Sequence, residues 1–278
     1  MRHVVYSPRV DRLIYLQEKA TPEFWEARWE AEGKPPPPSL HDEVVMVTRR
    51  YLRPGARLLE GGCGRADKVK SLTAAGYASI GIDFASGVVA QARIDYPGID
   101  VRLGDVRALE FPDRFFDGYW SIGVIEHFWD GYDAILAEAA RVLRAGGIFF
   151  LTAPWISPYR RRRVRSGDYP VEDFSAEPVS FYQFALGRSE VVDALERHGF
   201  RILRWRGSAS EISMQEDMPR LKRQIDWLLG SRGSIIKRVI RKSITRCADP
   251  YCGHSFMAIA RREGAGHGVD ARSTIAAS

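Results

Sequence analysis

The stretch from Leu58 to Ala66 combines an acidic residue with closely spaced glycines, and this combination suits the binding of a nucleotide. Apolar residues lead through Glu60 to Gly62 and Gly64, and a helical pattern follows, so we expect a strand, a glycine turn and a helix. Such a turn brings free backbone N–H groups close to a ligand. Only one residue separates Gly64 from Ala66, whereas a dinucleotide-binding loop has two there, and no phosphate-binding Lys-Ser/Thr pair follows. The spacing therefore favours a nucleotide without a pyrophosphate.

A second carboxylate stands where a bound ribose would need one. The apolar run 78–84 predicts a strand that contains Asp83, about twenty residues after the glycines. A carboxylate at this point of a βαβ unit accepts hydrogen bonds from the ribose hydroxyls. The alternative is that Asp83 only caps the next helix, as acids after strands often do. The same alternative holds for Asp105, which follows a third predicted strand.

Strands and helices alternate through the rest of this region. Further strands are predicted over 100–104, 116–121 and 148–152, and a helix before the last of them is expected to end at Gly146 and Gly147. Such alternation produces a parallel sheet with helices on both faces and ligands at the carboxyl ends of the strands. The predicted fold class is therefore α/β, with a Rossmann-like, doubly wound sheet.

Together these motifs resemble the class I S-adenosylmethionine-dependent methyltransferases, in their small-molecule, methyltransferase type 11-like branch. The resemblance covers residues 45–205 and a final strand near 254–262. It implies a seven-stranded sheet with a final antiparallel strand, lid insertions, S-adenosyl-L-methionine as the cofactor and methyl transfer as the activity. The matching pieces are the glycine turn and the segments 81–83, 104–106, 123–128 and 141–147.

The resemblance also implies which residues hold the cofactor. Its methionine end is expected over the glycine turn with Glu60 near the ammonium group, while Asp83 holds the ribose and Asp105 accepts from the adenine amino group. The expected cofactor residues are Glu60, Gly62, Cys63, Gly64, Asp83, Phe84, Asp105, Val106, Ser121 and Ile122.

Methyl transfer from a sulfonium requires the protein mainly to align the acceptor and to remove its proton. His127 is the candidate catalytic base, because it follows the fourth strand and an imidazole titrates near neutral pH. The alternative is a packing role at the start of a helix, where Glu126 would orient it or cap the helix. Candidate substrate residues, each of which could instead be structural, are Trp25, Trp155, Tyr159 and Tyr182.

The predicted organisation has three parts. Residues 1–44 are an N-terminal helical lid segment, and 45–262 are the methyltransferase domain with insertions at 154–187 and 207–250. Residues 263–278, small and polar, are predicted to be a disordered tail.

Location and metal content can also be predicted. A signal-peptide core is missing near the first residue, and no apolar run reaches the roughly 20 residues of a membrane span. Three cysteines argue for a reducing compartment, so we expect a cytoplasmic protein, with peripheral membrane contact as an open possibility. No metal is expected, because Cys247, Cys252 and His254 lack a fourth ligand.

The net charge of +6 is concentrated outside the predicted cofactor core. One basic cluster spans 160–165, and a second runs from Arg220 to Arg246, where basic and apolar faces alternate at helical spacing and Trp227 lies off the apolar face. Two interpretations stay open. The apolar face packs on the sheet and the basic face is solvated, or the helix contacts an anionic membrane or an anionic substrate.

The predicted function is methylation of a small-molecule, lipid-linked, glycan or natural-product acceptor. Methylation of an oxygen atom is favoured over methylation of nitrogen or carbon. Aromatic residues suit an apolar acceptor, and the arginines suit a phosphate or carboxylate on it. One alternative is an RNA or other nucleic-acid methyltransferase, suggested by a pI near 9.3. Against it, residues 121–124 lack the Asn/Asp-Pro-Pro-aromatic turn of enzymes that methylate base amino groups. The other alternative is a non-catalytic cofactor-binding protein of the same fold.

Overall fold

A computed structural model describes most of the chain. The side chains of 235–240 are not described, and the residues outside the description are 1–2, 34–36, 219–223, 226, 228–234 and 265–278. Residues 265–278 of the predicted tail and most of 219–234, where the predicted basic segment begins, thus lie outside the described residues.

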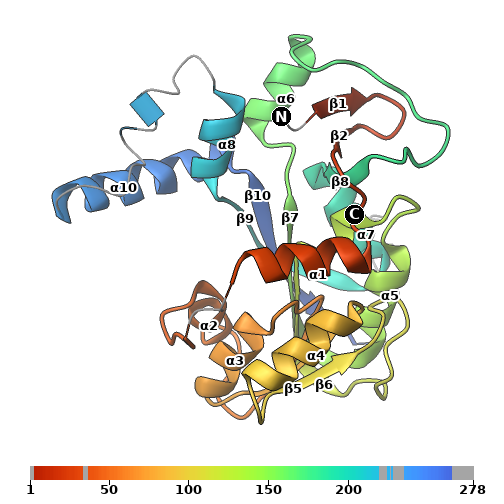
Figure 1. Ribbon diagram of the computed structural model, residues 1–278, viewed down its shortest axis with the longest axis vertical. Helices are drawn as coiled ribbons and strands as arrows, with labels where there is room; N and C mark the ends of the chain where they lie inside the picture. Colours follow the sequence, from red (N-terminus) through yellow and green to blue (C-terminus); the bar gives the residue numbers. More distant parts are fainter. Residues whose placement is uncertain (1–2, 34–36, 219–223, 226, 228–234, 265–278) are drawn as a thin grey trace, which may run out of the picture.

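A seven-stranded sheet forms the centre of the molecule, as the sequence predicts (Figure 1). Its strand order is β5-β4-β3-β6-β7-β10-β9, and β10 runs antiparallel to both of its neighbours. The predicted fold class is therefore confirmed. The strands are β3 (Arg57–Gly61), β4 (Ala78–Asp83), β5 (Asp100–Leu103), β6 (Phe116–Ile122), β7 (Leu143–Pro154), β9 (Phe200–Ser208) and β10 (Ser255–Arg262).

Alternating side chains of the central strands build a core on each face of the sheet. On one face Tyr119 packs with Phe149 and with the helices α5 (Asp133–Val142) and α7 (Arg188–Arg197). On the other, Trp120 stacks on Phe150 with ring centroids 4.3 Å apart. That second face is covered by α2 (Glu43–Thr48), α3 (Asp67–Ala74) and α4 (Ser86–Asp95).

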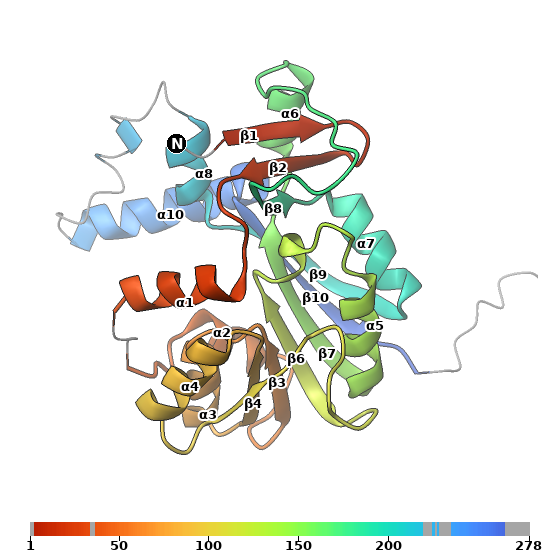
Figure 2. The same cartoon turned by 45° about the vertical axis from the view of Figure 1, so that its right-hand side comes forward.

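A second, three-stranded sheet stands beyond the carboxyl ends of the central strands (Figure 2). It joins the hairpin of β1 (His3–Ser7) and β2 (Arg12–Leu16) to β8 (Phe181–Ala185). Residues 1–44 are predicted to be a helical segment, and the strands β1 and β2 correct that prediction. Two short strands show too little alternation to be recognised, and β8, which completes their pairing, lies far along the chain.

The helix α1 (Pro22–Ala31) follows this hairpin and lies across the open end of the central sheet (Figure 2). Thr21 caps it by accepting a hydrogen bond from the Phe24 N–H at 3.3 Å, and Pro22 occupies its first turn. No residue of α1 is buried. The helix is held to α4 by the Glu26 carboxylate, which accepts from the Gly87 N–H at 2.8 Å.

Three further helices belong to the insertions: α6 (Pro158–Arg165), α8 (Ser210–Asp217) and α10 (Ile235–Cys252). The prediction that a helix ends at Gly146 and Gly147 is wrong. The helix α5 ends at Val142, because Leu143 pairs with Phe116 and is the first residue of β7. No helix in the described part of the chain has the length and apolar character that a bilayer span requires.

Candidate active site

The glycine turn after β3 is fixed by backbone hydrogen bonds to the neighbouring strand. The N–H groups of Gly62 and Cys63 donate to the Ile82 carbonyl at 2.8 and 2.9 Å. The Asp83 carboxylate accepts from the Gly64 N–H at 2.8 Å and from the Ala85 N–H at 3.0 Å. One carboxylate thus joins the turn to the start of α4. Burial raises the pKa of Asp83, against the lowering effect of these N–H donors.

Glycine is required at two positions of this turn. Gly62 and Gly64 have φ of +72° and +50°, in the left-handed region. A Cβ on Gly62 would lie 2.5 Å from Cγ2 of Val124, and one on Gly64 would lie 2.9 Å from Cζ2 of Trp29. The two glycines therefore let Val124 and Trp29 pack directly against the turn.

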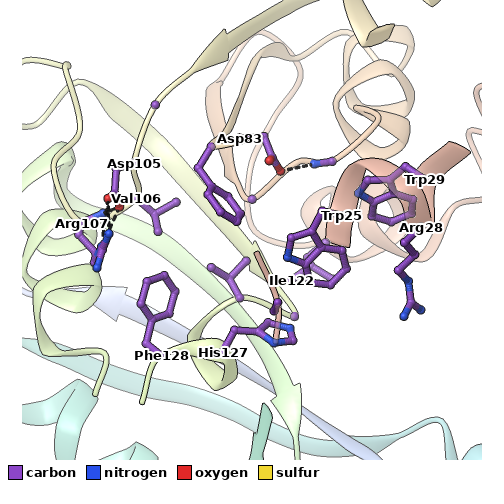
Figure 3. Close-up of a pocket in the computed structure, with 17 residues that line it drawn as sticks. Trp25, Arg28, Trp29, Asp83, Asp105, Val106, Arg107, Ile122, His127 and Phe128 are labelled. Carbon is purple, nitrogen blue, oxygen red and sulfur yellow. Dashed lines mark hydrogen bonds and ion pairs between the residues drawn. The ribbon is translucent and has the colours of Figure 1, made fainter. Parts of the chain in front are cut away.

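A cavity of about 280 Å³ adjoins this turn (Figure 3). Glycines and carboxylates line one side of it, and aromatic residues line much of the rest. The lining residues are Ala20, Trp25, Arg28, Trp29, Gly62, Gly64, Asp83, Phe84, Gly104, Asp105, Val106, Arg107, Ile122, Gly123, Val124, His127 and Phe128.

Asp105 and Arg107 lie together at the end of the cavity beyond β5 (Figure 3). The Arg107 guanidinium makes a bidentate ion pair with the Asp105 carboxylate, with N···O distances of 2.6 to 3.0 Å. This hydrogen-bonded pairing lowers the pKa of Asp105 and compensates the charge of Arg107. Val106 lies between them in the sequence and faces the cavity.

His127 lines the opposite side of the cavity, in a 3-10 turn after β6. Its Nδ1 lies 2.7 Å from the Tyr182 carbonyl, which can only accept, so Nδ1 carries the proton and Nε2 holds the lone pair. Trp25 packs edge-on against the imidazole with centroids 5.3 Å apart. Burial lowers the pKa of His127 to about 4, with a smaller lowering from the positive charge of Arg28, so the imidazole is neutral near pH 7.

Arg28 is the second arginine of the cavity, and the sequence analysis does not select it. Its guanidinium donates to the Tyr182 hydroxyl at 3.4 Å and lies over the Trp25 ring at 5.7 Å. The nearest carboxylate, Glu32, is 3.7 Å from Nε, which is beyond hydrogen-bond distance. Residues three apart in a helix lie on the same face, and Arg28 follows Trp25 by three residues. This spacing could have indicated Arg28 once Trp25 was chosen as a candidate.

Three of the expected cofactor residues lie behind the wall of the cavity. Glu60, Cys63 and Ser121 are buried and do not line it. Strand alternation explains Ser121, because its neighbour Ile122 faces the cavity. Burial raises the pKa of Glu60 to about 8, and its Oε2 has no hydrogen-bond partner among the described residues. A role for these three residues in contacting the cofactor stays a prediction.

The expected substrate residues separate into two groups. Trp25 lines the cavity, and Tyr182 supports it through His127 and Arg28 without lining it. Trp155 and Tyr159 lie elsewhere. Trp155 packs on Trp205 at 6.2 Å between centroids, and the Tyr159 hydroxyl donates to a backbone carbonyl of α8 at 3.3 Å. The structure does not bring these two to the cavity.

The residues present fit S-adenosylmethionine. Gly62 and Gly64 line the cavity with backbone alone, so a ligand can approach the turn closely. Each oxygen of Asp83 takes one backbone hydrogen bond and keeps a lone pair for a ribose hydroxyl. Phe84 and Val106 supply apolar surface for a flat base, and aromatic faces suit a sulfonium cation.

This fold and this site define the class I S-adenosylmethionine-dependent methyltransferase domain. Residues 59–151 match the model of the methyltransferase domain family. Over these residues the chain is therefore similar to methyltransferase domains.

Relatives of known sequence agree with this assignment. The chain is 31% identical over 160 residues to a "Probable S-adenosylmethionine-dependent methyltransferase" of Mycolicibacterium smegmatis, covering 58% of each chain. It is 30% identical over 149 residues to a "Fatty-acid O-methyltransferase" of the same organism, covering 51% of this chain and 53% of that protein. The chain thus spans somewhat more than half the length of these two relatives.

Solved structures are similar in fold. A "[4+2]-Cyclase SpnF" gives a TM-score of 0.56 at 19% identity, covering 90% of this chain and 98% of that chain. An S-adenosylmethionine-dependent methyltransferase from Mesorhizobium loti gives a TM-score of 0.51 at 16% sequence identity. The match covers 81% of this chain and 100% of that chain. Because one of these two is titled a cyclase, the fold alone does not fix the reaction.

Proposed function

We propose that this protein is an S-adenosylmethionine-dependent methyltransferase that methylates an oxygen atom of a small, largely apolar acceptor. The observation that carries the proposal is the shared cavity. Asp83 and the glycine turn line one side of it, and the aromatic residues of α1 line the other. A donor and an acceptor can therefore meet within one enclosed space, which in-line transfer requires.

The cofactor would be held by residues of the first half of the domain. Gly62 and Gly64 would lie under its methionine part, Asp83 would accept from the ribose hydroxyls, and Phe84 and Val106 would pack beside the base. When bound, it supplies a methyl group on a sulfonium, which needs no further activation. Trp25 and Trp29 exclude water from the opposite side.

The acceptor side of the cavity favours an apolar molecule. Trp25, Ile122, Val124 and Phe128 line it with hydrocarbon and aromatic surface. The names of three relatives support a lipid or other small-molecule acceptor, and two of these names include O-methylation. They are a "Fatty-acid O-methyltransferase", a "Phthiotriol/phenolphthiotriol dimycocerosates methyltransferase 1" of Mycobacterium ulcerans and a "(+)-O-methylkolavelool synthase" of Herpetosiphon aurantiacus.

His127 as the base stays a prediction. The lone pair on Nε2 suits the acceptance of a hydrogen bond from an acceptor hydroxyl, because Nδ1 already donates to Tyr182. Full protonation of the ring is disfavoured, since burial lowers its pKa to about 4.

The direct test is calorimetric titration of the purified protein with S-adenosylhomocysteine, followed by incubation with methyl-labelled S-adenosylmethionine and lipid extracts. We expect saturable binding and label in the organic phase. Binding without any label in the extract would favour a non-catalytic cofactor-binding protein. Label transferred to RNA in the same assay would instead support a nucleic-acid methyltransferase.

Peripheral contact with an anionic membrane is a second, separate proposal. Trp227 is 71% exposed, and the adjoining α10 exposes Ile244 together with the basic residues Lys242 and Arg246. Apolar and basic side chains on one helix suit a bilayer surface. Co-sedimentation with vesicles containing phosphatidylserine tests this, and equal sedimentation of the Lys242→Ala/Arg246→Ala variant would remove the electrostatic part.

A further inference from the structure

Two arginines line the cavity, and they differ in whether a carboxylate compensates their positive charge. Arg107 makes a bidentate ion pair with Asp105 at 2.6 to 3.0 Å. Arg28 has no carboxylate within hydrogen-bond distance among the described residues, and Glu32 approaches no closer than 3.7 Å on the exposed side of the helix. An exposed pair at this distance is weak. Arg28 therefore brings an incompletely compensated positive charge to the cavity.

The donors of Arg28 are also incompletely used. The contact with the Tyr182 hydroxyl is long, at 3.4 Å, and within the described part of the chain the buried Nε–H group has no hydrogen-bond partner. A buried N–H that lacks an acceptor is costly unless a ligand supplies one. A planar guanidinium in this state matches a planar carboxylate, which can accept two of its N–H groups.

Arg28 lies beside the group that faces the acceptor. Arg28 and His127 both contact Trp25 and Tyr182, and the charge of Arg28 acts on the imidazole. Arg28 and His127 thus share two neighbours on the same part of the cavity wall. Protonation of His127 is opposed by burial and by Arg28, whereas a negative charge at the same place is favoured by Arg28.

We propose that the acceptor is a carboxylate, that Arg28 binds it, and that the product is a methyl ester. This inference rests on the proposed methyltransferase function and names its substrate class. A carboxylate oxygen forms a bond to the methyl carbon as the methyl–sulfur bond breaks and its electron pair stays on sulfur. The acceptor anion and the sulfonium cation are both neutralised, and no proton is released, so no base is needed.

The test compares an acid with its neutral counterpart on the same chain. Octanoate and octan-1-ol are titrated into protein saturated with S-adenosylhomocysteine, for the wild type and for Arg28→Gln, Arg28→Lys and Arg102→Gln. Arg102 is the matched control, since it lies on β5 outside the cavity and pairs with Asp100. Methyl octanoate and octyl methyl ether are then measured by gas chromatography–mass spectrometry with S-adenosylmethionine present.

We expect octanoate to bind ~10- to 100-fold more weakly to Arg28→Gln, because charge-assisted hydrogen bonds are lost. Octan-1-ol should bind all variants alike, Arg28→Lys should be intermediate, and Arg102→Gln should resemble the wild type. The wild type should form methyl octanoate and no ether.

The proposal would be wrong if the wild type loaded with S-adenosylhomocysteine did not bind octanoate, or if Arg28→Gln bound octanoate as well as the wild type. Preferential methylation of octan-1-ol would also overturn it. A loss of S-adenosylhomocysteine affinity in Arg28→Gln would overturn it too, because Arg28 would then bind the cofactor. Failure of the wild type to bind S-adenosylhomocysteine at all would overturn the proposed function itself.

Discussion

The two sides of the cavity are built in different ways. The side that would hold the cofactor comes from residues 62–107, in the segments that follow the strands β3, β4 and β5. Backbone hydrogen bonds fix it, as the Asp83 carboxylate shows by joining the glycine turn to α4. The acceptor side adds α1, more than thirty residues earlier in the chain, and support from β8.

This difference suggests how the domain can change its substrate without changing its cofactor. The family model matches residues 59–151, which include every cavity residue except Ala20, Trp25, Arg28 and Trp29. The donor side is therefore the part shared with the methyltransferase domain family. The acceptor side also depends on α1, which lies outside that match, and substitutions of the α1 residues that face His127 should affect the acceptor more than the cofactor.

Removing a buried charge partner far from the cavity should have the largest effect. Arg160 in α6 is fully buried, donates to Asp217 of α8 at 2.8 Å and lies 2.9 Å from Nδ1 of His254. Arg160→Gln removes the fully buried cation beside Asp217 and leaves that carboxylate the longer ion pair with Arg163 at 3.3 Å, so we expect a loss of ~3 kcal/mol in the free energy of unfolding, measured in urea. The exposed pair of Arg144 with Asp117 is the control, and Arg144→Gln should cost at most about 1 kcal/mol.

The same variant sharpens the comparison of the two sides. Because α6 belongs to the insertion that carries β8, Arg160→Gln should weaken acceptor binding more than S-adenosylhomocysteine binding. Equal losses in both titrations at a temperature where the variant is folded would show that the two sides are not separable.

Asp83→Ala should break the donor side. It removes the acceptor of the Gly64 and Ala85 N–H groups and the proposed partner of the ribose, so we expect S-adenosylhomocysteine affinity to fall about 100-fold or more. Calorimetry measures the affinity, and circular dichroism checks the fold. Wild-type affinity in this variant would mean that Asp83 only links the turn to α4.

The two tryptophans of α1 offer a matched pair within one helix. Trp29 lies against Gly64 on the donor side, whereas Trp25 packs on His127. Trp29→Ala should weaken S-adenosylhomocysteine binding about tenfold and spare the acceptor, and Trp25→Ala should do the reverse. If both substitutions weakened the same ligand, the division of the cavity would be wrong.

The sequence predicts the donor side better for a physical reason. The glycine turn and Asp83 follow from local patterns, since strand alternation, turn residues and spacing all act within about 25 residues of chain. Arg28 depends on where α1 docks, and β1 and β2 depend on pairing with β8. The ion pair of Asp105 with Arg107 also cannot be predicted from a sequence motif, because a motif specifies a residue type and not the side chain that it contacts.

The smallest expected effect concerns pH. Burial lowers the pKa of His127 to about 4, from an ordinary value of 6.5, so the ring stays neutral well below pH 6.5. If the acceptor is a carboxylate, kcat/KM for octanoate should vary less than about threefold between pH 5.5 and 8, with no inflection near 6.5.

Stability gives an independent check on the same group. A histidine whose pKa is lowered in the folded state takes up a proton more readily when unfolded. The free energy of unfolding should therefore decrease as the pH falls from about 6.5 towards 4. His127→Asn keeps an N–H donor that can reach the Tyr182 carbonyl and does not titrate, so this part of the pH dependence should disappear while octanoate turnover persists. A variant that loses turnover more than 100-fold but binds octanoate normally would restore His127 as the base and contradict the carboxylate acceptor.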